Sequence, residues 1–230
     1  MVGLTLLVLL AIGLVVADLV AAQRTRETVA DDISENLDDV VGTPTVDVGG
    51  FPFLLQLARG ELRRLDATVE GATLGGIAMT DLSVVADGVS TSTPHTADEV
   101  VVQATIPTSS LQEAVVERTS LELTVEVAGD ALRLRGTVLG LDLTGDLTPR
   151  VEDGRLFVDV QTLSVGGVRV EIDALPAELS SRLTDLEVPV QELPDGLVLT
   201  DAVVQSDGVR VTASGTDVEV PAGAGTSPTS

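Results

Sequence analysis

The chain has 230 residues, of which 44% are hydrophobic, and its 36 acidic and 13 basic side chains give a formal net charge of -23. All of the basic residues are arginine. Because a surface this acidic repels the phosphate backbone of nucleic acids, we exclude nucleic acid as a partner. The absence of cysteine excludes disulfides, thiolate metal sites and a lipidated cysteine, while three Phe and no Trp or Tyr leave an aliphatic core.

The first notable segment is an apolar run over residues 2–17, in which one threonine is the single polar side chain and which Asp18 ends. The run is longer than most signal-peptide cores but shorter than the roughly 20 residues of a comfortable bilayer crossing. We interpret residues 1–22 as a hydrophobic signal or anchor segment, with an uncleaved anchor favoured over a cleaved signal. Arg24 and Arg26 follow the run and nothing basic precedes it, which is the reverse of the usual charge bias for an outward-facing domain.

A helix is predicted to continue from this segment. Apolar residues recur at spacings of seven or four, as one helical face requires, at Ala22, Val29, Ile33, Leu37 and Val41. We therefore assign residues 23–42 to a helical connector.

Beyond Gly42 the apolar pattern changes to a period of two, which predicts a single β-rich domain over residues 43–220. The alternation is cleanest in Leu121–Val127, Leu132–Val138 and Leu139–Leu147. Residue pairs that contain glycine separate these runs, and because glycine supplies the positive φ of tight turns, they predict a mostly antiparallel meander. These turns are expected at Gly75–Gly76, Asp87–Gly88, Gly129–Asp130, Asp153–Gly154, Gly166–Gly167, Asp195–Gly196 and Asp207–Gly208.

Few helices are available to cover the predicted strands. Short helices are expected at Phe51–Arg59, Thr108–Arg118 and Ala177–Leu183, and the last two each follow a proline. The one-sided strands must bury their apolar faces against one another, a helix, a partner or a lipid acyl chain, and self-burial is the simplest of these. Residues 221–230 carry no apolar side chain larger than proline or alanine and are expected to be a disordered tail.

The sequence contains few of the residue types that serve as catalytic nucleophiles or bases. The single histidine, His95, lies in a Ser/Thr/Pro-rich loop, and Cys, Lys and Tyr are absent. The densest acidic cluster of the domain shows no calcium-loop spacing and is interpreted as solvated, although a paired acid and base or a calcium site stays open. That cluster is Asp142, Asp146, Glu152 and Asp153. We predict a non-enzymatic protein with no metal and no other cofactor.

One segment resembles a known family. Residues Val46–Arg64, VDVGGFPFLLQLARGELRR, resemble the opening of the LmeA-like phospholipid-binding family of actinobacterial cell-envelope proteins, and Gly-Phe-Pro-Phe is their most specific part. The Asp18 boundary, Gly60 after the short helix and the Gly75–Gly76 turn are similar to that family, as are the helices after Pro107 and Pro176. Together these features span nearly the whole chain.

The resemblance implies an α+β, β-dominated fold in which a long curved antiparallel sheet wraps around helix, as in tubular lipid-binding folds. It also implies a non-catalytic phospholipid-binding protein of the cell envelope, a carrier or sensor whose partner is phospholipid or membrane lipid. Such a protein is extracytoplasmic and tethered to the cytoplasmic membrane by its N-terminal segment, or secreted if the leader is cleaved. The alternative is a structural envelope module that packs on itself and binds a protein partner without lipid.

Candidate lipid-binding residues lie in the resembling segment. We expect an acyl chain to contact its apolar side chains and a lipid headgroup to approach one of two arginines that follow them. An equally weighted alternative is that these arginines balance surface acids. The candidates are Phe51, Phe53, Leu54, Leu57, Arg63 and Arg64.

Overall fold

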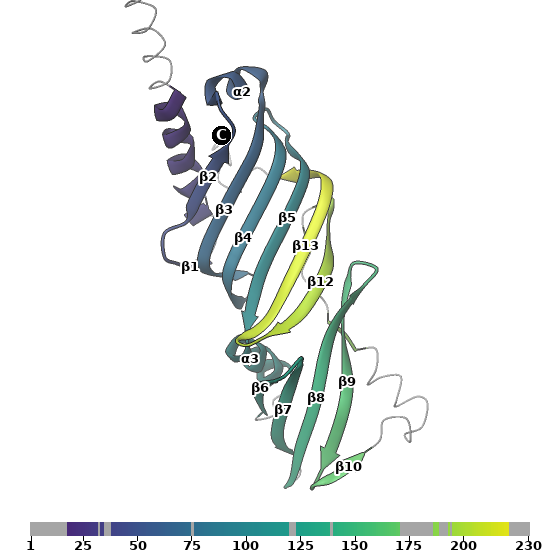
Figure 1. The fold of residues 1–230 in the computed structure, drawn as a ribbon. Coiled ribbons are helices and arrows are strands. Elements are labelled where there is room, and N and C mark those ends of the chain that lie inside the picture. Colours follow the sequence, from purple (N-terminus) through teal and green to yellow (C-terminus); the bar gives the residue numbers. More distant parts are fainter. Residues whose placement is uncertain are drawn as a thin grey trace, which may run out of the picture.

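The structure is a computed structural model that describes residues 18–31, 33–34, 38–74, 76–119, 123–138, 140–170, 186–188, 193 and 195–220. It is β-dominated, with strands arranged in two antiparallel sheets and with a few helices. This confirms the predicted α+β, β-dominated class. The long curved sheet that was predicted is divided between two sheets placed end to end along one long axis (Figure 1).

The first sheet combines strands from both ends of the chain. Its order is β1-β3-β4-β5-β13-β12, with β2 also paired to β3, so the last strand of the chain lies between β5 and β12. The strands are β1 (Asp38–Val41), β2 (Thr45–Gly49), β3 (Glu61–Leu74), β4 (Ile77–Ser90), β5 (His95–Pro107), β12 (Leu197–Gln205) and β13 (Gly208–Val220).

The second sheet is formed by the chain between β5 and β12. It follows sequence order as β10-β9-β8-β7-β6, with β11 paired to β9. Strand β12 of the first sheet contacts β8 and β9, which joins the two sheets. The strands are β6 (Leu123–Ala128), β7 (Ala131–Val138), β8 (Leu141–Glu152), β9 (Arg155–Val165), β10 (Val168–Val170) and β11 (Leu186–Val188).

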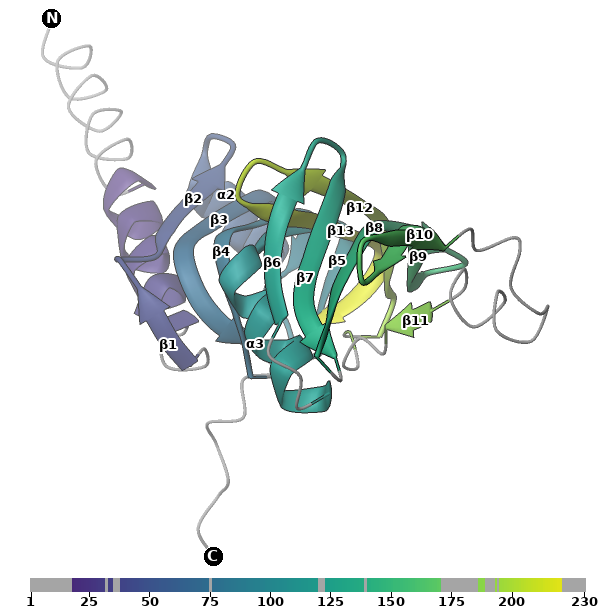
Figure 2. The ribbon, with the colours of Figure 1, turned by 90° about the horizontal axis from the view of Figure 1, so that it is seen from below.

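Helices lie at the end of the first sheet, along its edge and at the junction of the sheets. Helix α2 (Phe53–Arg59) caps the free end of the first sheet, and α3 (Thr108–Thr119) packs against β6 where the two sheets meet (Figures 1 and 2). A helix over residues 18–31 runs along β1 and β2, as seen in both views. The predicted helices at Phe51–Arg59 and Thr108–Arg118 are thus confirmed, whereas Ala177–Leu183 lies outside the described residues.

The predicted helical connector over residues 23–42 is wrong at its C-terminal end. Residues Asp38–Val41 form β1, which pairs with β3, so the sheet begins before residue 43. The helical part packs on the sheet, because Ala22 contacts the buried cluster that contains Val48 and Phe53, and Ile33 contacts the one that contains Val69. This segment therefore belongs to the packed fold, not to a linker.

The core is built from small aliphatic side chains in four clusters. Phe53 is its one fully buried aromatic residue in the described structure, at 1% exposure. At the junction, Val125 and Leu132 of the second sheet pack with Ala202 and Val209 of the first, and Leu111 of α3 packs against them. A shared cluster thus fastens the two sheets together.

Most of the predicted turns are confirmed, but Asp87–Gly88 is not a turn. These two residues lie inside β4, which continues to Ser90, and the chain turns at residues 91–94. Gly88 still has a positive φ of 63°, and a Cβ there would collide with the carboxylate of Asp98 on β5. Glycine is favoured here by the left-handed backbone and by the Asp98 side chain on the neighbouring strand, a contact that local sequence does not reveal.

Gly208 also serves a purpose that differs from the predicted one. It does link β12 to β13, but its φ is not positive. Glycine is needed instead because its Cα faces the backbone of Ile106 and Pro107 on β5. A Cβ at this position would collide with the Ile106 carbonyl. Gly145 in β8 also has an ordinary φ, but an added Cβ would make only van der Waals contact, 3.6 Å from the Thr162 carbonyl oxygen.

Gly208→Ala is therefore expected to lower the free energy of unfolding by about 1–3 kcal/mol, because two backbones must separate to admit the methyl group. The matched control Gly145→Ala should leave stability unchanged or raise it by up to about 1 kcal/mol, since it removes conformational freedom from the unfolded chain. Urea denaturation followed by circular dichroism measures both. Equal stabilities for the two variants would contradict the assigned close approach.

Candidate functional site

Helix α2 forms the free end of the first sheet. Pro52 precedes its first residue with extended backbone and makes no side-chain cap. The helix ends at Gly60, whose φ of 77° is left-handed and whose N–H is donated to the carbonyls of Gln56 and Leu57. After this one short helix the chain enters β3 at Glu61.

The missing cap of α2 is supplied by Asp18, from 35 residues away. The N–H of Phe53 donates to Asp18 Oδ2 at 2.8 Å, and the N–H of Leu54 donates to Asp18 Oδ1 at 2.6 Å. Asp18 is only 5% exposed, so both carboxylate oxygens are used within the protein. A carboxylate at a helix N-terminus satisfies free amide groups and interacts favourably with the helix dipole. The first described residue of the N-terminal helix is thereby fixed to α2.

Gln56 ties together the chain on both sides of α2. Its amide nitrogen donates to the carbonyl oxygens of Gly49 and Gly50, at 3.3 and 2.8 Å. Its amide oxygen accepts the N–H of Arg63 at 2.8 Å. Because Gln56 is 5% exposed, these bonds form inside the fold and hold β2, α2 and β3 in one arrangement.

The structure separates the predicted apolar candidates into two groups. Phe53 is buried with Ala22, Val48 and Leu62, so it anchors α2 to the sheet. Phe51, Leu54 and Leu57 are 63%, 37% and 43% exposed and point away from that core.

Sequence reasoning missed three further exposed side chains at this end, because helical spacing alone does not reveal which positions lack a covering element. These are Leu55 on α2, and Leu19 and Val20 beside Asp18. We call the six exposed residues the apolar tip: Leu19, Val20, Phe51, Leu54, Leu55 and Leu57.

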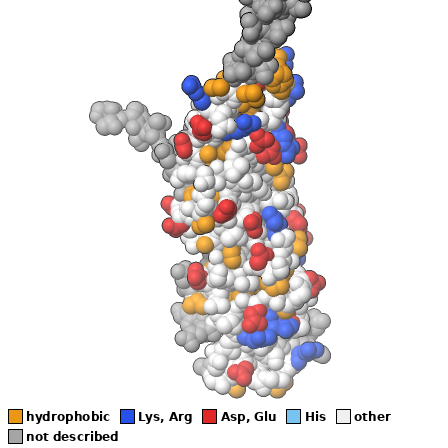
Figure 3. Space-filling model, turned by 60° about the vertical axis from the view of Figure 1, so that its left-hand side comes forward, with side chains coloured by type: hydrophobic (Ala, Val, Ile, Leu, Met, Phe, Trp, Pro, Cys, Tyr) orange, Lys and Arg blue, Asp and Glu red, His pale blue; other side chains and the backbone are white. Residues whose placement is uncertain are grey.

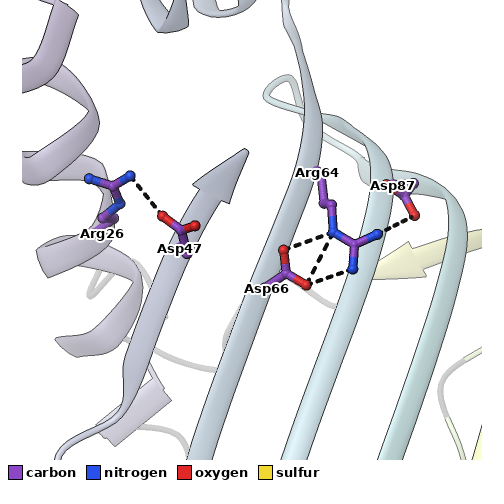
Figure 4. Close-up of polar contacts among 5 residues, drawn as sticks. All are labelled: Arg26, Asp47, Arg64, Asp66 and Asp87. Atoms are coloured by element: carbon purple, nitrogen blue, oxygen red, sulfur yellow. Dashed lines mark hydrogen bonds and ion pairs between the residues drawn. The ribbon is translucent and has the colours of Figure 1, made fainter. Parts of the chain in front are cut away.

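The two predicted arginines also differ in their surroundings. Arg64 lies on the outer face of the sheet, where its guanidinium is 2.9 Å from Asp66 and 3.6 Å from Asp87 (Figure 4). The hydrogen bonds that the Arg64 guanidinium donates to the Asp66 carboxylate raise the pKa of Arg64. Arg64 thus balances surface acids, as in the alternative weighed from sequence. Arg63 is exposed and uses its backbone N–H to bind Gln56.

An aliphatic face runs across the first sheet on the side opposite to Arg64. Strand pairing places Val84 of β4 beside Val102 of β5, and Val102 beside Ala213 of β13. Its ends pack against the N-terminal helix, through Ile33, and against α3, through Leu111. Several members of this aliphatic face are only half-buried, namely Leu65, Val84, Val102 and Val211.

The second sheet offers polar cavities instead. Two open cavities of about 340 and 300 Å³ lie on its polar side, and the smaller is lined by Arg133, Arg135, Asp146, Thr162 and Arg169 among others. Arg133 donates two hydrogen bonds to the Asp146 carboxylate, at 2.6 and 2.9 Å. The bond from Arg133 lowers the pKa of Asp146, the hydroxyl of Thr162 adds to this effect, and partial burial opposes it.

Comparison with known proteins identifies a family. The model of the family described as LmeA-like phospholipid-binding matches residues 16–214. Searches among curated proteins and among solved structures found no match. Within the part of the chain that the structure describes, no helix has the length and apolar character needed to cross a membrane.

Asp18→Ala is expected to lower the free energy of unfolding by about 1–2 kcal/mol, because two amide groups of α2 lose their acceptor. Asp18→Asn, which keeps one acceptor oxygen, should lie between wild type and Asp18→Ala. The exposed Asp31 on the same helix supplies the control, since Asp31→Ala removes a carboxylate that does not bind α2. Chemical denaturation measures all three, and equal effects at positions 18 and 31 would contradict the capping role.

The ion pair of Asp146 should make stability depend on pH. Because its folded-state pKa is lowered, the stabilisation is present above the unfolded pKa of about 3.9 and is lost as the pH falls through the folded value. Asp146→Asn is therefore expected to be less stable than wild type at pH 7, by about 1 kcal/mol or less for this partly exposed pair, with a smaller deficit at pH 3. Urea midpoints at both pH values test this, with Asp142→Asn as a control that leaves the Arg133 pair intact. A deficit independent of pH would refute the assignment.

Proposed function

The chain belongs to the LmeA-like phospholipid-binding family, and from this membership we propose that it binds phospholipid as a carrier or sensor of the cell envelope. The observation that carries the proposal is the family match over residues 16–214, which includes α2, the second sheet and all of the first sheet except the last six residues of β13. The match establishes that the chain belongs to a phospholipid-binding family. The role in the cell envelope and the binding of phospholipid as cargo are what we propose.

The aliphatic face is the surface best suited to an acyl chain. It consists of Ala, Val and Leu side chains on β3, β4, β5 and β13 and is half-buried between the N-terminal helix and α3. Each methylene group moved from water onto such a surface gains about 0.8 kcal/mol, so a long acyl chain needs no polar contact for stable binding. The scarcity of aromatic residues keeps this face smooth.

We further propose that the protein is extracytoplasmic and held at the cytoplasmic membrane by residues 1–22, or secreted if this segment is removed. The support is the apolar sequence of residues 2–17 and its end at Asp18. We propose no catalytic step. Two of the four carboxylates in the densest acidic cluster are paired with arginine, Asp146 with Arg133 and Glu152 with Arg150, which gives them a structural use.

The alternative is a structural module that packs on itself and binds a protein partner without lipid. It is favoured by the junction cluster, in which Val125 and Leu132 bury apolar surface of the second sheet directly against the first. Lipid occupancy distinguishes the two functions.

The full chain, purified from a bacterial membrane fraction, is expected to carry phospholipid in near-stoichiometric amount by native mass spectrometry and lipid extraction. Val102→Asn should reduce this occupancy several-fold, because an amide on the aliphatic face must lose its water to let an acyl chain bind. Val101→Asn is the matched control, since the neighbouring side chain is also half-buried but points to the opposite face of β5.

A wild-type protein free of lipid, both as purified and after incubation with phospholipid vesicles, would favour the structural module. Equal loss of lipid in both variants would place the cargo somewhere other than the aliphatic face. Circular dichroism establishes that each variant is folded before its lipid content is compared.

A further inference from the structure

Exposed apolar side chains gather at one end of this elongated molecule. The described residues include eleven large hydrophobic side chains that are exposed, and six of them form the apolar tip. The other five are scattered over both sheets, at Val41, Leu141, Val168, Val198 and Val203. Figure 3 shows hydrophobic side chains of this end beside basic ones, while hydrophobic, acidic and basic side chains are interspersed over the rest of that face. A concentrated patch of this kind marks an interaction surface.

The segment that contains α2 has a charge opposite to that of the whole chain. Residues 51–64 contain three arginines and one acid, Glu61, which gives a local charge of +2, from 3 minus 1, against -23 overall. Arg64 is engaged with Asp66 and Asp87 on the outer face of the sheet. Arg59, in the last turn of α2, and Arg63, at the start of β3, are both exposed beside the apolar tip. Apolar side chains flanked by arginine suit the interface of a bilayer that contains anionic lipid.

The course of the chain leads to the same surface. The apolar run of residues 2–17 ends at Asp18, and the carboxylate of Asp18 is held at 2.6 and 2.8 Å from the first two amide nitrogens of α2. Residue 18 therefore cannot move away from α2 without breaking these two hydrogen bonds. A membrane that accommodates the apolar run must lie next to the apolar tip.

We propose that the α2 end of the domain rests directly on a lipid bilayer. Phe51, Leu54, Leu55 and Leu57 enter the interfacial region, while Arg59 and Arg63 contact the phosphate groups of anionic lipids. Buried Phe53 and the Asp18 cap hold α2 in this orientation, so the long axis points away from the membrane and the second sheet projects from it. The inference rests on the proposed function in that it places the protein at a membrane, but it does not depend on a bound cargo.

The absence of tryptophan from the natural chain allows a direct test. One tryptophan is introduced into the full chain at the tip, as Leu55→Trp, and in a matched variant at the far end of the second sheet, as Leu141→Trp. Both native side chains are about half exposed, at 46% and 52%, so neither change disturbs the core. Each protein is incorporated into phosphatidylcholine–phosphatidylglycerol vesicles with and without bromine atoms on the acyl chains, which quench only nearby tryptophan.

For Leu55→Trp we expect emission at shorter wavelength and a several-fold loss of intensity in brominated vesicles, while Leu141→Trp keeps its intensity. Unquenched emission at both positions would overturn the proposal. Emission from Leu55→Trp that is shifted but unquenched would also overturn it, because protein and not lipid would then cover the tip. Equal quenching at both positions would overturn it as well, because the molecule would then lie flat on the membrane.

A second measurement separates this inference from the proposed function. Arg59→Gln combined with Arg63→Gln should reduce the quenching of Leu55→Trp in vesicles that contain phosphatidylglycerol and leave it unchanged in pure phosphatidylcholine. If the double arginine variant of Leu55→Trp is quenched as strongly as Leu55→Trp alone in vesicles that contain phosphatidylglycerol, the headgroup contact is overturned. Native mass spectrometry of the same proteins reports the cargo independently. Lipid cargo with an unquenched tip refutes only the docking surface, and a quenched tip without cargo refutes only the carrier or sensor.

Discussion

The bond between Asp18 and the first turn of α2 determines how one end of this protein is organised. Helix α2 is too short to be stable by itself, and its preceding proline offers no side-chain cap. The buried carboxylate of Asp18 in the N-terminal helix caps α2, and in doing so fixes that helix along β1 and β2. The buried ring of Phe53 and the bonds of Gln56 then hold α2 on the sheet. Three separate parts of the sequence thus meet around one acidic group.

The aliphatic composition has a second structural effect. With few aromatic side chains, the core is divided into four small clusters, one of which joins the two sheets. The molecule is elongated, and several side chains on the inner face of the first sheet stay half-buried. A surface of this kind is stable without a ligand but still gains free energy when an acyl chain covers it. The composition is consistent with both the shape and the lipid-binding family.

Local features of the fold were predictable from sequence, and long-range features were not. The alternation in Leu132–Val138 and the proline before Thr108 act over a few residues, so β7 and α3 were predicted correctly. Residue Val41 fits a helical spacing by coincidence, and only pairing with β3 reveals a strand. The Asp87–Gly88 pair resembles a turn in sequence, and the contact of Gly88 with Asp98 on another strand is visible only in the structure. For the site, the segment around α2 was identified, but its partner Asp18 and the burial of Phe53 depend on contacts formed in three dimensions.

The position of β13 has a consequence for the order in which the protein folds during synthesis. Strands β6 to β10 pair with their neighbours in sequence, so the second sheet can assemble as soon as those residues leave the ribosome. Strand β5 has β4 on one side, but its other neighbour, β13, is synthesised more than 100 residues later, by comparison of Pro107 with Gly208. The first sheet therefore keeps an open edge until β13 has been synthesised, which exposes a β-rich intermediate to pairing with other chains. Premature termination before β13 leaves that edge permanently open.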